Sequence, residues 1–236
     1  MIADLKLILE TLVSVGIDEA IIEPCPEGSL IRAANAAGNI IIFDTIADVV
    51  TTSPMGIQSV KGLLSRIALF DIDKCKVEFE EAGDYVRDIK IKQGRKSATF
   101  RFYPPKNIAA PKGMPASIES EVLTFTNEYV KYLGQAITAM TFTGKKEERT
   151  ITLKGATNGL SVTVSDGEDD TFDEVIEDIK TETNVGTWEA VPFQRVMNKS
   201  SDYNTTDKSA KFVIDNFGII TFDLSFIRVM IAPMAS

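Results

Sequence analysis

The chain has 236 residues, 34 of them acidic and 25 basic, which gives a formal net charge of −9. It contains two cysteines, Cys25 and Cys75, and no histidine. These counts exclude a zinc cluster, a cysteine–histidine nucleophile and a disulfide framework, and they favour a reducing compartment. Because 44% of the residues are apolar, the composition is that of a globular protein with a sizeable core.

The N-terminal residues 1–16 are rich in apolar side chains, as a signal peptide would be. They lack a basic start, and Asp4, Lys6 and Glu10 interrupt the apolar run. No stretch of about 18 apolar residues occurs in the chain, so we expect no membrane partner. The sequence therefore predicts a cytoplasmic protein, in the host cytoplasm if the protein is viral.

A proline-rich segment lies near the middle of the chain, between Tyr103 and Pro115. Prolines remove backbone donors and fix φ, so this segment suits neither a helix nor a central strand. We therefore predict two domains of similar size joined by an extended connector. The predicted bounds are 1–103 for the N-terminal domain, 104–121 for the connector and 122–236 for the C-terminal domain.

Each half shows apolar residues at helical spacing, followed by runs that alternate or are rich in β-branched residues. The predicted helices cover 3–15, 57–70, 126–140 and 189–201. The clearest predicted strands include 40–43, 88–92, 97–102, 150–153, 160–164 and 212–214. Asn158-Gly159 is a hairpin turn signal. The pattern predicts an α+β fold made of two similar domains, each with short helices packed on antiparallel sheets.

The sequence shows no catalytic arrangement, and we expect neither an enzyme nor a cofactor. Glycine-rich phosphate loops are missing. The acidic run 166–174 lacks the alternating oxygen ligands, central glycine and closing glutamate of an EF-hand loop. A solvated loop or a charged contact is the favoured interpretation of this run, and no metal is predicted.

Charges are segregated along the chain. Segment 87–101 has six basic residues against Asp88 alone, and segment 166–182 has nine carboxylates against Lys180 alone. One interpretation is two solvated strand faces. The other is a pair of complementary surfaces on different copies of the chain, in a head-to-tail contact that closes into a ring.

The predicted helices carry most of their cations on polar faces. Such a surface is suited to phosphate contact without base readout, although any amphipathic helix presents some lysine to water. No aromatic residue interleaves with these cations, so base stacking is not indicated. The candidate DNA-contacting residues are Lys6, Lys61, Arg66, Lys131, Arg195 and Lys199.

Two short motifs give the chain a family resemblance. The linker ends in Gly113-Met114-Pro115, and the C-terminal strand runs from Arg228 into Ala232-Pro233. In this order and spacing they resemble the DNA sliding clamps, including proliferating-cell nuclear antigen. The chain length and Ala110-Pro111-Lys112 resemble the clamps of T4-type bacteriophages even more. Val229 and Met230 stand where cellular clamps carry an aromatic pair, which favours a viral subfamily.

The resemblance implies a ring whose helices line a central hole and, with two domains per chain, a homotrimer. A clamp encircles duplex DNA, tethers the DNA polymerase for processive replication, and is opened by a clamp-loader ATPase. Carried over to this sequence, the pocket for the C-terminal tail of the polymerase would include Met114, Met230, Ala232 and Pro233. The charge segments place the expected subunit interface at Arg95, Lys96 and Arg101 of one copy and at Asp173, Glu174 and Glu177 of the next.

Two alternatives remain open from the sequence. A structural phage protein, such as a tail-tube or connector subunit, also forms rings from β-rich chains, although such proteins usually lack four regularly spaced amphipathic helices. A monomeric viral processivity factor of the herpesvirus kind has similar domains but does not close into a ring. The mass in solution separates the monomer from a ring.

Overall fold

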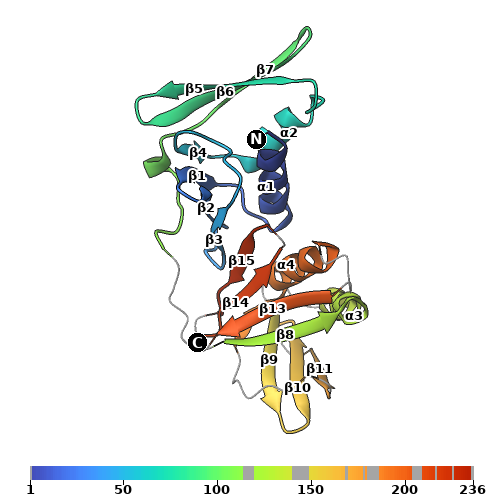
Figure 1. Cartoon of the computed structure of the whole chain (residues 1–236). Helices are drawn as coiled ribbons and strands as arrows, with labels where there is room; N and C mark the ends of the chain where they lie inside the picture. Colours follow the sequence, from blue (N-terminus) through green and yellow to red (C-terminus); the bar gives the residue numbers. More distant parts are fainter. Residues whose placement is uncertain are drawn as a thin grey trace. The chain divides into compact units, whose positions relative to one another are not determined.

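The computed structural model describes residues 2–113, 120–139, 149–167, 170–177, 179, 186–203, 209–215, 217–224 and 226–234 (Figure 1). The chain divides into two compact units, Met1–Met114 and Pro115–Ser236. The division falls within the predicted connector. None of the described helices is long and apolar enough to cross a membrane.

The first unit contains two α-helices, a short 3₁₀ helix and two antiparallel sheets. Helix α1 packs against α2. One sheet has the strand order β4-β1-β2-β3, and the other has the order β5-β6-β7. The elements are α1 (Ile2–Ser14), β1 (Ala20–Cys25), β2 (Gly28–Ala34), β3 (Ile40–Ile46), β4 (Met55–Ile57), α2 (Val60–Ile67), β5 (Lys76–Ala82), β6 (Tyr85–Gln93), β7 (Lys96–Arg101) and the 3₁₀ helix η1 (Pro105–Asn107).

Apolar spacing and capping explain where the two helices lie. The predicted faces of α1 and α2 are buried, with Leu5 and Leu12 among the α1 residues and Leu63 among those of α2. Helix α2 is shorter than its predicted range because Ile57 belongs to β4. Its N-cap is Ser59, whose hydroxyl accepts a hydrogen bond from the Gly62 backbone amide at 3.1 Å.

The second unit repeats this plan with one strand added before its first helix. Helix α3 packs against α4, and the sheets have the orders β15-β14-β13-β8 and β11-β10-β9-β12. The elements are β8 (Ser120–Thr126), α3 (Asn127–Ala139), β9 (Thr150–Ala156), β10 (Gly159–Ser165), β11 (Thr171–Ile176), β12 (Thr187–Glu189), α4 (Ala190–Tyr203), β13 (Ser209–Asp215), β14 (Ile220–Asp223) and β15 (Arg228–Ile231).

The core of the second unit is aromatic. Trp188, Phe193, Phe212 and Phe222 are all almost fully buried. The Phe193 ring meets those of Phe212 and Phe222 edge to face, with centroids 6.2 and 5.9 Å apart. The Trp188 Nε1 donates to the Gly218 carbonyl at 3.0 Å, which satisfies the one polar atom of its ring.

The same order of elements therefore occurs twice along the chain. The series from α1 through α2 to β7 corresponds, one for one, to the series from α3 through α4 to β15. Each series is a helix, four strands, a second helix and three strands. The predicted α+β fold of two similar domains, with short helices on antiparallel sheets, is confirmed.

Candidate functional site

The candidate DNA-contacting cations lie on the four described α-helices. Lys61 on α2, Lys131 on α3 and Arg195 on α4 are exposed, whereas Lys6 on α1 and Lys199 on α4 are half-buried. Lys6 Nζ lies 3.6 Å from Glu10 Oε1, one helical turn away, so part of its charge is compensated within α1. Lys61, Lys131 and Arg195 are thus the best placed of this set for an anionic partner.

Arg66, the remaining member of the set, is directed toward strand β7. Its guanidinium carbon lies 5.1 Å from the centroid of the Phe100 ring, and its Nη1 donates to the Gly62 carbonyl at 2.9 Å. Both residues line a pocket of about 470 Å³ at the end of β7. Arg66 therefore belongs to a basic and aromatic site at the edge of a sheet, which the helical spacing alone did not predict.

A shallow groove runs between α3 and α4. Its volume is about 700 Å³, and its polar lining includes Lys131, Gln135, Gln194 and Asn198. Gly134 of α3 lies where the Gln194 side chain of α4 comes close, since a Cβ added to this glycine would be 2.6 Å from Gln194 Nε2. Amide side chains of this kind can donate to phosphate oxygens. They were not among the residues predicted from the sequence, because only the charged side chains of the helices signalled phosphate contact.

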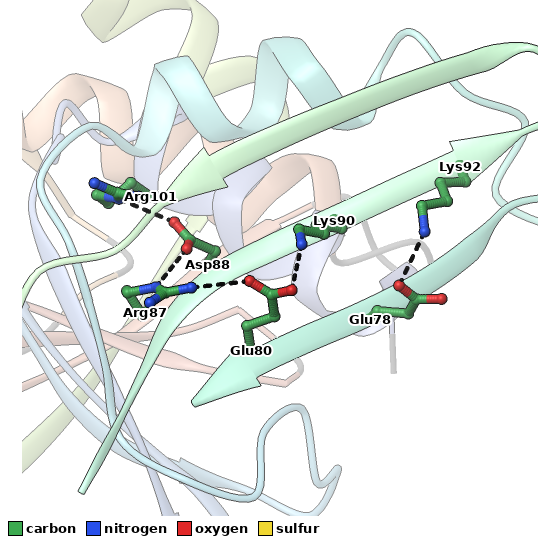
Figure 2. Close-up of polar contacts among 7 residues, drawn as sticks. All are labelled: Glu78, Glu80, Arg87, Asp88, Lys90, Lys92 and Arg101. Carbon is green, nitrogen blue, oxygen red and sulfur yellow. Dashed lines mark hydrogen bonds and ion pairs between the residues drawn. The ribbon is translucent and has the colours of Figure 1, made fainter. Parts of the chain in front are cut away.

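The sheet β5-β6-β7 carries a chain of ion pairs across its strands (Figure 2). Arg87 Nη2 lies 3.0 Å from Glu80 Oε2, Lys92 Nζ lies 3.1 Å from Glu78 Oε2, and Lys90 also pairs with Glu80. The carboxylates of β5 thus face the cations of β6. Strand pairing brings in Glu78 and Glu80 from outside segment 87–101, so two of its five net positive charges are offset and about three remain.

Asp88 is the buried centre of this network. Its side chain is only 4% exposed and lies 2.6 Å from Arg87 Nε and 3.0 Å from Arg101 Nε. Burial acts to raise the pKa of Asp88, but the bonds from Arg101 and Arg87 outweigh it and hold that pKa below its usual range. The bond from Lys90, aided by Arg87, likewise lowers the pKa of Glu80. Arg101 is therefore held in place at the edge of the sheet while remaining 71% exposed.

Strands β7 and β11 are both edge strands of their sheets. The predicted interface residues lie on or beside them. Arg95 and Lys96 are exposed at the start of β7, Asp173 and Glu177 are exposed on and after β11, and Glu174 is half-buried on β11.

Glu174 packs against helix α3 and lacks a complete set of hydrogen bonds. Its Oε2 and the hydroxyl of Tyr129 are buried beside each other, and among the described residues neither has a hydrogen bond of good geometry. Burial, together with the neighbouring Glu174 carboxylate, raises the pKa of the Tyr129 hydroxyl. The acidic edge thus contains a carboxylate oxygen to which no described residue donates a well-formed hydrogen bond.

The predicted pocket for a polymerase tail is only partly described. Met114 lies outside the described residues. Met230 on β15 is 3% exposed, whereas Ala232 and Pro233, which follow this strand, are half-buried. The Met234 amide donates to the Thr187 carbonyl of β12 at 2.8 Å, so this segment is fixed along the sheet edge. Of the three described members, Ala232 and Pro233 are the accessible ones.

The start of the connector is attached to the first unit. The Tyr103 and Gly56 backbones exchange hydrogen bonds of 2.8 and 3.1 Å, and Arg32 Nη1 donates to the Pro111 carbonyl at 3.4 Å. Beside the connector lies a cavity of about 620 Å³ whose lining includes Ala109, Ala110 and residues 34–38 of the β2–β3 hairpin. None of the predicted pocket residues lines this cavity.

The described residues hold no group of three or more cysteine, aspartate or glutamate side chains that could bind a metal ion. What they present is two helix pairs that carry exposed cations, two charged sheet edges, and a connector attached to the first unit.

No protein-family model matches the chain, and no curated protein sequence is similar to it. Solved structures, in contrast, match almost all of it. The PCNA of Entamoeba histolytica has a TM-score of 0.63 at 15% identity, over 98% of this chain and 94% of that one. The PCNA of A. fulgidus, solved with the C-terminal region of FEN-1 bound, has a TM-score of 0.61 at 12% identity, over 98% and 95%.

A bacterial clamp gives a similar score. The DNA polymerase sliding clamp of Pseudomonas aeruginosa matches with a TM-score of 0.67 at 13% identity, over 98% of this chain and 64% of its own. The chain therefore has the DNA sliding clamp fold, in its two-domain, PCNA-like form. The resemblance seen in the sequence is confirmed at the level of fold.

Proposed function

We propose that this chain is the subunit of a DNA sliding clamp, which encircles duplex DNA and tethers a DNA polymerase so that replication is processive. The observation that carries the proposal is the match of the clamp fold over 98% of the chain, at nearly the full length of two PCNA chains. The role is binding rather than catalysis. A clamp-loader ATPase would open the ring, and the clamp itself would need no cofactor.

The assembly we propose is a homotrimer closed head to tail. Strand β7 of one copy pairs with strand β11 of the next, because each is an edge strand with unpaired backbone groups. Cations at Arg95, Lys96 and Arg101 would then meet carboxylates at Asp173, Glu174 and Glu177. Such complementarity favours the correct pairing over pairing of two identical edges.

DNA contact is assigned to the exposed helix cations, chiefly Lys61, Lys131 and Arg195, with Lys6 and Lys199 less accessible. These side chains would contact phosphates without reading bases, which permits sliding. An acidic protein can bind DNA in this way if its cations face the bore, so the net charge of −9 is no obstacle. Arg66 is the exception, because its guanidinium lies over Phe100 at the edge of a sheet.

The partner site we propose is the one that the family resemblance implies, with Met114, Met230, Ala232 and Pro233 as its members. It would bind the C-terminal tail of the polymerase and the tails of other replication proteins. Methionine side chains adapt to different apolar partners. Ala110-Pro111-Lys112 and the absence of the aromatic pair at Val229 and Met230 favour a bacteriophage clamp acting in the host cytoplasm.

Salt-dependent binding to short duplexes tests the DNA contact. The double variant Lys61→Ala/Arg195→Ala should bind duplex DNA less tightly. A plot of the logarithm of the binding constant against the logarithm of the salt concentration should also be less steep, by about one unit of slope for each phosphate that the variant no longer neutralises. A matched control is Lys106→Ala/Lys154→Ala, which removes one exposed lysine per unit outside the α-helices. An equal decrease in both double variants, or a preference of the wild type for one duplex sequence, would contradict the assignment.

A further inference from the structure

The two sides of strand β7 present different cations. Phe100 lies on the side that faces α2, since Arg66 covers its ring at 5.1 Å. The next residue, Arg101, points to the opposite side, because neighbouring residues of a strand alternate. There its Nε bonds Asp88 Oδ1 at 3.0 Å while most of the side chain stays exposed. One guanidinium therefore lies on each side of the same edge.

Strand β11 presents carboxylates in a corresponding way. Phe172 lies on the side that faces α3, with its ring 5.7 Å from that of Tyr132. Glu174 shares this side and lies against Tyr129. Asp173 points to the other side, where it accepts hydrogen bonds from hydroxyl groups of neighbouring threonines. Among the described residues, no ion pair joins Asp173 or Glu174 to a cation.

Glu174 has a specific need for a donor. Its Oε2 is buried beside the Tyr129 hydroxyl without a well-formed hydrogen bond to it, and among the described residues no cation pairs with this carboxylate. A buried carboxylate oxygen without a donor is unfavourable, and a guanidinium from another molecule can supply several donors at once. The Arg66 guanidinium is exposed, and the Gly62 carbonyl uses only one of its donor nitrogens.

We propose that Arg66 and Arg101 of one copy bind Glu174 and Asp173 of the next copy, on opposite sides of a joint formed by β7 and β11. The pairing is antiparallel, as in every strand pair assigned within the two units, and it sets Phe100 opposite Glu174. This inference rests on the proposed ring. It specifies which residues of β7 and β11 face each other in that ring. It also assigns Arg66 to the contact between subunits instead of to the DNA-contacting residues.

The register follows from the side of its strand on which each of these side chains lies. If α2 and α3 lie on the same side of the continuous sheet, Phe100 can face only Phe172, Glu174 or Ile176. With Glu174 opposite Phe100, Arg101 faces Asp173 directly. A shift of two residues either way sets Arg101 opposite Thr171 or Val175. Only the proposed register gives both cations a carboxylate partner.

Cysteine cross-linking tests the register directly. In it Thr99 faces Val175, so their Cβ atoms should be about 4.5–5.5 Å apart, close enough for an intermolecular disulfide. The variant Thr99→Cys/Val175→Cys, with Cys25 and Cys75 replaced by serine, should give a covalent trimer on oxidation. The matched control, Thr99→Cys/Thr171→Cys, moves one thiol by four residues, roughly 13 Å along the strand, and should not cross-link.

A charge exchange tests the new contact of Arg66. Arg66→Glu and Glu174→Arg should each weaken the trimer by about tenfold or more per interface, and the combined variant should recover most of that affinity. Lys106→Glu makes the same change in charge at an exposed site in the same unit and should leave the trimer unaltered. Equal weakening by Lys106→Glu, or no recovery in the combined variant, would overturn the contact.

The outcomes separate this inference from the proposed function. If the protein is a trimer before oxidation but cross-links through Thr99→Cys/Thr171→Cys, or through neither pair, the proposed register is wrong. The proposed ring is not contradicted by that result. A chain that sediments as a monomer before oxidation overturns the ring and the register together. A covalent trimer from Thr99→Cys/Val175→Cys alone supports both.

Discussion

Gly28 and Gly159 occupy equivalent positions in the two halves of the chain. Gly28 begins β2, where an added Cβ would lie 2.0 Å from the carbonyl oxygen of Ile46 at the end of β3. Gly159 begins β10, where an added Cβ would lie 2.1 Å from the carbonyl oxygen of Ile176 at the end of β11. The same close backbone approach thus recurs in two hairpins with no obvious sequence identity, which supports an internal duplication.

Substituting either glycine by alanine should destabilise the chain strongly. The Cβ would meet backbone atoms that cannot move without breaking the strand pairing, and Gly28 also has a φ of 140°. We expect a decrease of more than about 2 kcal/mol in the free energy of unfolding for each, measured by urea denaturation. Gly94→Ala is the control. Gly94 also has a positive φ, but nothing lies within 4 Å of its Cβ position, so the decrease there should be only about 1 kcal/mol.

Asp88→Asn should weaken the sheet β5-β6-β7 in a pH-dependent way. The folded-state pKa of Asp88 is lowered, so its contribution is present above the unfolded pKa of about 3.9 and is lost as the pH falls through the folded pKa. At neutral pH we expect the free energy of unfolding to fall by about 1–2 kcal/mol, because the carboxylate is buried but both arginine partners are partly exposed.

The measurement is urea denaturation of the variant and the wild type at about pH 7 and about pH 3. The difference between them should shrink toward the lower pH. Asp84→Asn, in the exposed turn between β5 and β6, serves as the control for the same change of residue. A difference that is constant over this range would show that Asp88 does not act through its charge.

Tyr129→Phe should leave the stability of the separate subunit unchanged or raise it by up to about 1 kcal/mol. The change removes a buried hydroxyl without a hydrogen-bond partner among the described residues and keeps the ring contact with Phe125, whose centroid lies 5.0 Å away. Thermal unfolding of dilute protein is the appropriate measurement. Tyr129→Leu, which also removes the aromatic ring, provides the comparison. A marked decrease of stability in Tyr129→Phe would mean that the hydroxyl is bonded after all.

Arg32→Lys should loosen the connector. Arg32 holds Glu23 through two bonds of 2.7 and 3.0 Å and also donates to the Pro111 carbonyl, an arrangement that lysine cannot reproduce. We expect tryptic cleavage after the exposed Lys112 to become several-fold faster. Glu23→Gln keeps the donor to Pro111 and should have the smaller effect. An unchanged cleavage rate in Arg32→Lys would show that this contact does not hold the connector.

The sequence predicts the helices well because their apolar spacing and caps are local signals. Lys61 and Arg195, which the sequence puts on polar helix faces, are exposed on α2 and α4. The direction of Arg66 could not be predicted, since it depends on Phe100, which a distant strand brings beneath it. The partial compensation of segment 87–101 could not be predicted for a similar reason, because β5 supplies Glu80 only after the strands pair.

Sedimentation equilibrium of the unmodified chain tests the central claim most directly, because a closed ring of two-domain clamp subunits requires three copies. We predict a reversible association to three times the chain mass of 25.9 kDa. Salt should weaken this association, because it screens the attraction between the charged edges of neighbouring copies. A chain that stays at 25.9 kDa up to its solubility limit would contradict the ring. An association that passes three copies without a plateau would contradict it equally.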